Sequence, residues 1–131
     1  MTKRTSIHIE DFHHVNPIPA ACRIGRLLAS GIVNGTDPAT GKVAPTLEQQ
    51  CAYMFAHVRR IVEAAGGTTD DIIKMTVWMS DRSQREALNR EWLKMFPHEN
   101  SRPARQAMQA SLTGGILIQC DFLAVLGDIA G

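Results

Sequence analysis

The chain has 131 residues, 44% of them hydrophobic, and its 14 basic and 13 acidic side chains leave a formal net charge of +1. This length predicts a single domain, residues 1–131, that can fold without a metal or a disulfide. The even charge balance argues against a protein that binds nucleic acid or a membrane through electrostatics. Three cysteines without paired spacing predict reduced thiols in a cytoplasmic protein.

Short strands and turns are predicted for the first third of the chain. The strands expected from their apolar residues are 6–9, 20–24 and 27–33. The dipeptide 25–26 separates the last two strands as a tight turn. Residues 34–45 are rich in glycine and proline, so we expect a loop there.

A long helix is predicted after this loop. Thr46 and Gln49 have the spacing of a capping box, in which the two side chains bind free amides of the first turn. Apolar residues recur at helical spacing through residues 51–65, and the glycine pair 66–67 is expected to end the helix. His57 falls on the polar side of this pattern, so we expect it to face solvent.

The second half of the chain predicts a strand, a shorter helix and two more strands. Residues 73–79 alternate as a strand does, and residues 83–86 are expected to open a capped helix that ends at Pro97. The last two strands are expected at 104–110 and 116–126. This order predicts an α+β fold in which both helices cover one face of a mixed sheet. The other face is apolar, which predicts a partner subunit.

One charged residue interrupts the most apolar strand of the chain. Asp121 lies within residues 116–126, where a carboxylate is costly unless a partner or water compensates it. Arg105 is a suitable partner, because its planar guanidinium binds a carboxylate through two hydrogen bonds. Two interpretations are open. The two residues form a structural ion pair between neighbouring strands, or Arg105 binds a substrate carboxylate while Asp121 handles a proton or a water.

Short motifs follow one another between about residues 16 and 126 in a recognisable order. They are Ser30-Gly31, Asp37-Pro38-Ala39-Thr40-Gly41, Val62-Glu63-Ala64-Ala65-Gly66, Asp70-Asp71-Ile72-Ile73-Lys74-Met75-Thr76-Val77, Leu88-Asn89 and Arg102-Pro103-Ala104-Arg105. Together they resemble the RidA family, also called YjgF/YER057c/UK114 and often labelled endoribonuclease L-PSP. The resemblance implies a chorismate-mutase-like α+β fold and a homotrimer whose sheets form a central β-barrel.

The resemblance also implies an activity. Active members of the family hydrolyse reactive imines and enamines such as 2-aminoacrylate to keto acids and ammonia, without a cofactor, in clefts between subunits. By resemblance, Arg105 would bind the substrate carboxylate, and Asp121 stands where the family has a glutamate thought to position the water. Gly31 and Ala107 match positions whose backbone amides can face the ligand. The residues that the resemblance places in the substrate-binding pocket or its wall are Ser30, Gly31, Asn89 and Ala107.

Three positions depart from the family pattern. Ile18-Pro19-Ala20-Ala21 stands where the family has Gly-Pro-Tyr-Ser, so the pocket tyrosine is absent, and Ala107 stands where a cysteine is common. Asp121 is one methylene shorter than the family glutamate. Because Ala20 and Ala107 leave room for a bulkier acid, a catabolic deaminase of an aminomuconate-like substrate is one alternative. A non-catalytic trimer that binds a small ligand or has a regulatory role is the other.

Two adjacent histidines precede the second strand. Side chains of neighbouring residues in an extended segment point to opposite sides, so His13 and His14 are not expected to share a metal. Two interpretations of these histidines remain open. They lie in a loop or an interface, or one of them lies in the pocket. The expected partners are therefore a small carboxylate-bearing substrate and further copies of the chain, with no nucleic acid, membrane, metal or cofactor.

Overall fold

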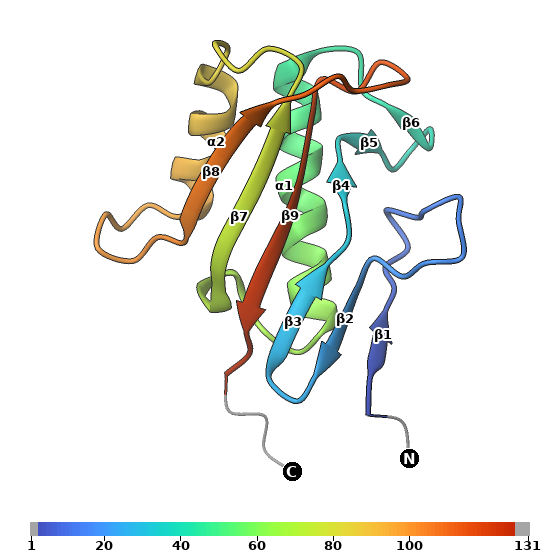
Figure 1. Cartoon of the computed structure of the whole chain (residues 1–131), viewed down its shortest axis with the longest axis vertical. Helices are drawn as coiled ribbons and strands as arrows, with labels where there is room; N and C mark the ends of the chain where they lie inside the picture. Colours follow the sequence, from blue (N-terminus) through green and yellow to red (C-terminus); the bar gives the residue numbers. More distant parts are fainter. Residues whose placement is uncertain (1–2, 128–131) are drawn as a thin grey trace.

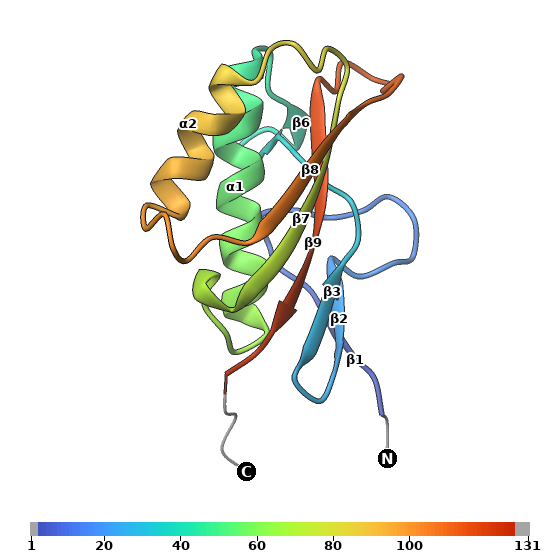
Figure 2. The same ribbon diagram turned by 60° about the vertical axis from the view of Figure 1, so that its left-hand side comes forward.

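The structure is a computed structural model that describes residues 3–127. Both helices cover the same face of a mixed sheet (Figures 1 and 2), which confirms the expected α+β fold class. The elements are β1 (Thr5–Ile7), β2 (Ala21–Ile24), β3 (Leu27–Ser30), β4 (Val33–Asn34), β5 (Thr36–Asp37), β6 (Lys42–Val43), α1 (Leu47–Ala64), the 3-10 turn η1 (Thr69–Asp71), β7 (Ile72–Met79), α2 (Glu86–Met95), β8 (Ala104–Gln109) and β9 (Ile118–Val125).

Seven strands form the main sheet in the order β1-β2-β3-β9-β7-β8, and β4 pairs with β9 beyond the end of β3. Neighbouring strands are antiparallel except β7 and β8, which are parallel and are connected through α2. Parallel neighbours need such a crossover because both strands start at the same end of the sheet. The segment 34–45, expected to be a loop, also contains the small hairpin β5–β6. That prediction was wrong because strands of two residues show no periodicity.

The two helices begin in different ways. Thr46 accepts a hydrogen bond from the Gln49 amide at 3.2 Å, which confirms the predicted start of α1. Helix α1 ends at Ala64, with Ala65 as its C-cap before the predicted glycine pair, and Gly66 adopts a φ of +94° that favours glycine. Helix α2 has no side-chain cap, and the Ser83 hydroxyl donates to Asp81 instead. The predicted cap of α2 was therefore wrong.

The hydrophobic core lies between the helices and the sheet face that they cover. Strands β7 and β9 direct alternate side chains into it, and Met75 and Phe122 are almost completely buried. Cys51 and Cys120 are free cysteines within this core. Burial raises the pKa of the Cys51 thiol to about 12 and raises that of Cys120 as well. Both thiols therefore stay protonated and unreactive at neutral pH.

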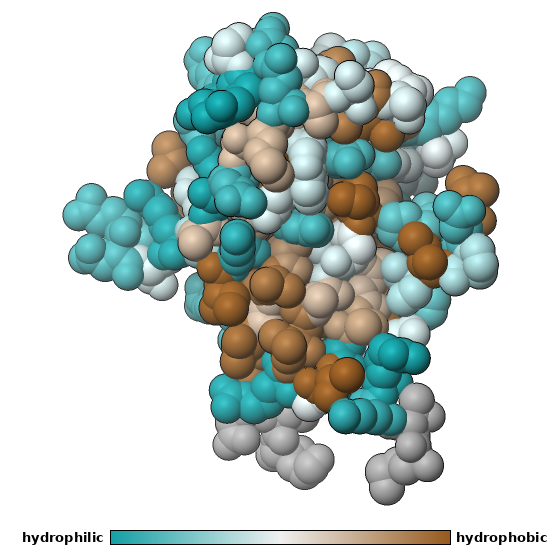
Figure 3. All heavy atoms as spheres, viewed as in Figure 1, coloured by the Kyte–Doolittle hydropathy of each residue, from teal (hydrophilic) through white to brown (hydrophobic). Residues whose placement is uncertain are grey.

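The opposite sheet face carries no helix. Figure 3 shows a hydrophobic patch on it, over the lower ends of the strands. The exposed residues that contribute to this open face are Ile24, Leu27, Leu123 and Val125. A contiguous apolar surface of this kind is typical of an interaction site. Within residues 3–127, neither α1 nor α2 has the run of apolar residues that crossing a membrane requires.

Candidate functional site

The sheet places Arg105 and Asp121 on opposite faces. Strand β7 lies between their strands, and Arg105 is beside Met75 while Asp121 is beside Thr76. Paired residues share a face, and consecutive residues of a strand point to opposite faces. Met75 points into the core, so Arg105 lies on the helix side and Asp121 on the open face. The structural ion pair between neighbouring strands was therefore a wrong interpretation.

Helix α2 holds the Arg105 guanidinium at the outer edge of the sheet. Nη2 donates a hydrogen bond to the Asn89 side-chain oxygen at 2.8 Å, and the guanidinium carbon lies 4.8 Å from the centre of the Trp92 ring. Asn89 and Trp92 are three residues apart on α2, so they reach the same side of the helix. The predicted site residues Arg105 and Asn89 are thus in direct contact, and Trp92 is an additional contact that was not predicted.

The Arg105 guanidinium can still form an ion pair and further hydrogen bonds. Within residues 3–127 it has no ion pair, and its Nη1 is enclosed without a hydrogen-bond partner. Burial, and secondly the positive charge of Arg85, lowers the pKa of Arg105. A positive charge that is partly desolvated and lacks a counter-ion provides a favourable site for an anion, and a planar fork suits a carboxylate.

Backbone amides beside Arg105 are also directed outward. The Ala110 amide donates to the Met79 carbonyl oxygen at 3.0 Å, so alternate residues of β8 direct their amides toward β7. By the same alternation, the amides of Arg105 and Ala107 point to the outer edge. This orientation agrees with the amide role expected for Ala107, which stays a prediction. We call Asn89, Arg105 and Ala107 the arginine half-site.

Asp121 lies on the open face of the sheet beside Thr76. Burial raises the pKa of its carboxyl group, and the Lys74 charge acts in the opposite direction. The raised pKa makes the carboxylate a stronger base than an aspartate in water. Its environment therefore fits a group that accepts a proton from water, although this role stays a prediction.

Ser30 and Gly31 lie where β3 ends beside β9. The Ser30 hydroxyl donates to the Gly31 oxygen and accepts from the Phe122 amide, both at 2.8 Å. The Gly31 amide donates to Ala20 O at 2.9 Å, so the expectation that it faces a ligand was wrong. The pairing with β9 shifts by one residue between Ala29–Leu123 and Val33–Cys120, so Asp121 lies in β9 beside the segment 30–32. We call Ser30, Gly31 and Asp121 the aspartate half-site.

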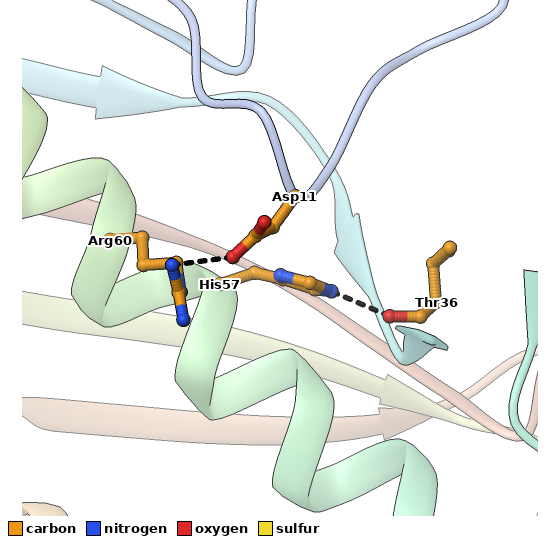
Figure 4. Close-up of polar contacts among 4 residues, drawn as sticks. All are labelled: Asp11, Thr36, His57 and Arg60. Atoms are coloured by element: carbon orange, nitrogen blue, oxygen red, sulfur yellow. Dashed lines mark hydrogen bonds and ion pairs between the residues drawn. The ribbon is translucent and has the colours of Figure 1, made fainter. Parts of the chain in front are cut away.

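The segment before β2 is attached to α1 through His57. Its Nε2 lies 2.7 Å from the Thr36 oxygen (Figure 4). The residue is 1% exposed, and its ring stacks on Phe12. Asp11 and Arg60 form an ion pair of 2.6 Å beside it. The expectation that His57 faces solvent was therefore wrong. The sequence did indicate this burial, because residue 57 continues the helical spacing of the buried residues 54, 58 and 61.

Because Thr36 O can only accept, His57 carries its proton on Nε2, which leaves the lone pair on Nδ1. That atom is enclosed without a partner in the described residues. Burial lowers the pKa of His57, so the ring is neutral at neutral pH. No three His, Cys, Asp or Glu side chains of residues 3–127 gather as a metal site would require.

Comparisons with known proteins agree with this fold. The family model described as Endoribonuclease L-PSP matches residues 9–126. A RutC family protein of Haemophilus influenzae is 30% identical over 85% of this chain and 88% of its own. The 2-iminobutanoate/2-iminopropanoate deaminase of Salmonella typhimurium is 29% identical over 85% and 88%.

A solved structure shows the same architecture. The crystal structure of the YJGF gene product from E. coli has a TM-score of 0.83 and 26% identity, and the match covers 92% of this chain and 98% of that chain. The chain therefore belongs to the RidA/YjgF family, whose model is described as Endoribonuclease L-PSP.

Proposed function

We propose that this protein hydrolyses a carboxylate-bearing imine or enamine to a keto acid and ammonia, at clefts between the subunits of a homotrimer. The observation that carries the proposal is the Arg105 guanidinium, which Asn89 and Trp92 hold without a counter-ion within the described residues. The relative from Salmonella typhimurium, named for its action on 2-iminobutanoate and 2-iminopropanoate, supports the substrate class.

The opposite orientation of the two half-sites explains why the cleft would need two chains. One small ligand cannot contact Arg105 and Asp121 of the same chain, since they lie on different faces of its sheet. A neighbouring chain that brings its open face to the edge strand β8 would complete the site. The apolar residues of that face, such as Leu123 and Val125, would be covered in the same contact. In the trimer, the three open faces would enclose the central barrel.

The chemistry requires orientation and one proton transfer. Arg105 would bind the substrate carboxylate through two hydrogen bonds and so fix the adjacent C=N bond. Asp121 of the neighbouring chain would take a proton from water as its oxygen bonds to the C=N carbon and the nitrogen gains the electron pair. Asp121 gives this proton to the nitrogen, which completes the carbinolamine. Asp121 then takes the hydroxyl proton and passes it to the nitrogen as the C=O bond forms and the C–N bond breaks, so ammonia leaves and the keto acid remains. General base catalysis of this kind contributes about 10²- to 10⁴-fold.

The direct test is an assay of ammonia release from freshly generated 2-iminobutanoate, together with light scattering of the same sample. We expect a trimer that accelerates hydrolysis over the reaction in buffer. The Arg90→Lys variant is a matched control, because Arg90 is an exposed arginine on α2. It should keep full activity. A trimer that releases no ammonia from any carboxylated imine would contradict the proposed activity, and a monomer would contradict the shared cleft.

A further inference from the structure

Lys74 lies diagonally from Asp121 on the open face of the sheet. In the β7–β9 register, Thr76 is opposite Asp121 and Lys74 is opposite Leu123. The intervening Met75 points into the core, so Lys74 and Thr76 point to the open face, as Asp121 does. Diagonal neighbours on one face of an antiparallel pair are about 7–8 Å apart, which is within reach of a long side chain. The lysine can therefore approach the carboxylate without a change in the backbone.

The two charges interact although they are not in direct contact. Within residues 3–127, neither Lys74 nor Asp121 takes part in an ion pair. Both residues are partly buried on a face that water still reaches. Burial raises the pKa of Asp121, and the positive charge of Lys74 lowers it. The lysine thus opposes the effect of burial on the group that the proposed function uses as its base.

The other segments beside Asp121 bring no charge to this face. The residues of β8 that are paired with the open-face positions of β7 are Ala104, Gln106 and Met108. Segment 30–32 has no titratable side chain. The His14 ring approaches Gly31, but burial lowers the pKa of this histidine, so it is neutral at neutral pH. Within residues 3–127, Lys74 is therefore the cation that compensates the charge of Asp121.

A neighbouring chain that covers the open face would make this compensation more important. Removal of water from Asp121 disfavours its charged form. The same removal strengthens the attraction between Asp121 and Lys74, because charges interact more strongly at a lower dielectric constant. In the proposed cleft, Arg105 of the neighbouring chain is a second cation, but the substrate carboxylate neutralises it. Lys74 is then the cation that remains to stabilise the Asp121 carboxylate.

We propose that Lys74 is a positioning residue of the candidate active site, which keeps the Asp121 carboxylate ionised and able to accept a proton when a neighbouring chain covers the open face. This inference rests on the proposed function, because Asp121 is its general base. Lys74 acts through Asp121 and does not contact the substrate. Without the lysine, Asp121 would take up a proton at a higher pH, and the protonated acid cannot serve as a base. Activity would then decline at a higher pH as the solution is acidified.

The test measures the ionisation of Asp121 and the pH dependence of activity separately. Lys74→Met removes the charge from a side chain of similar length, and Lys74→Arg keeps the charge. Lys42→Met, at an exposed position of β6, is the matched control. NMR follows the side-chain carboxyl carbon of Asp121 during a pH titration, with the signal assigned by its absence from Asp121→Asn. Ammonia release from 2-iminobutanoate gives the pH profile of kcat for the same proteins.

We expect Lys74→Met to raise the pKa of Asp121 and to move the acid limb of the kcat profile upward with it, by about one pH unit. At alkaline pH the rate should stay the same, because Asp121 is ionised there with or without the lysine. Lys74→Arg and Lys42→Met should titrate as the wild type does. An Asp121 pKa that Lys74→Met leaves unchanged, or that Lys74→Arg raises equally, would overturn the proposed role of the lysine charge.

The outcomes separate this inference from the proposed function. A raised Asp121 pKa in Lys74→Met, together with wild-type protein that hydrolyses no imine, would support the effect of Lys74 on Asp121 and contradict the deaminase activity. Hydrolysis of 2-iminobutanoate by the wild-type protein, together with an acid limb that Lys74→Met does not move, would support the activity and overturn the role of Lys74.

Discussion

Arg105 and Asp121 are both charged residues within strands, but their surroundings differ. Arg105 is held from the helix side by an aromatic ring and an amide oxygen, whereas Asp121 lies on an uncovered sheet face. The arginine half-site is arranged within one chain, and its guanidinium has a fixed direction. The aspartate half-site lies on a surface that a partner is expected to cover. The comparison teaches that one chain can build both halves of a site without bringing them together.

The largest expected effect belongs to the aspartate half-site. Asp121→Asn should slow imine hydrolysis about 10²-fold, the usual scale for a lost general base. The variant should still form the trimer and should bind 2-oxobutanoate with the same affinity as the wild type. Because burial disfavours the Asp121 charge, the variant should be at least as stable to heat as the wild type.

A longer acid at the same position sharpens this comparison. Asp121→Glu should preserve or increase the hydrolysis of small imines, because it restores the length of the glutamate that the family has there. Full activity of Asp121→Asn would remove this residue from the mechanism and leave orientation by Arg105 alone. Steady-state ammonia release from 2-iminobutanoate measures both variants.

A smaller loss is expected from a change of shape in the arginine half-site. Arg105→Lys keeps the charge but loses the two-pronged hydrogen bonding, so kcat/KM for carboxylated imines should fall about tenfold or more. The trimer should survive, since Arg105 lies at the outer edge of the sheet. Unchanged kinetics would show that the guanidinium does not bind the substrate, whereas an unfolded variant would show that its role is structural.

Removal of the amide that orients the guanidinium should have a weaker effect. Asn89→Ala deletes the acceptor of the Arg105 Nη2 hydrogen bond on an exposed helix surface. Loss of one such bond should raise KM about fivefold. The value of kcat should change little. Asn100→Ala, in the loop after α2, is the control. Equal KM values for the wild type and Asn89→Ala would show that Asn89 does not position Arg105.

The smallest expected effect is on stability and concerns His57, which is outside both half-sites. Burial lowers its pKa below the ordinary 6.5, and a proton on the enclosed Nδ1 would find no acceptor. As pH falls below about 6.5, the unfolded chain takes up a proton before the native protein does, so the free energy of unfolding decreases. Above that pH the stabilisation is present in full.

Thermal unfolding of a His57→Gln variant tests this effect. Between about pH 7.5 and pH 5, its Tm should fall less than that of the wild type, because glutamine does not titrate. His98→Gln, at an exposed position, should behave as the wild type does. Parallel Tm curves for His57→Gln and the wild type would show that His57 does not contribute to acid sensitivity.

Local patterns in the sequence predicted most of the elements but not how distant ones meet. Helical spacing and the Thr46 cap located α1, alternation located β7, and the apolar run 116–126 located β9. The order β9-β7-β8 depends on long-range strand pairing, so nothing near Arg105 or Asp121 showed that β7 separates them. The contact between Arg105 and Trp92 was missed for the same reason. The helical spacing indicated that His57 is buried, but the prediction followed the polarity of the histidine side chain instead.

The central claim is that each site combines Arg105 of one chain with Asp121 of another, and subunit complementation tests it most directly. Arg105→Ala and Asp121→Asn should each lose most of the activity when expressed alone, Asp121→Asn about 10²-fold. Equal co-expression gives mixed trimers, in which a cleft is intact only if each side comes from the suitable variant. Random assortment then restores about one quarter of the wild-type activity per cleft. Mixed trimers that remain as inactive as the separate variants would contradict a site shared between chains.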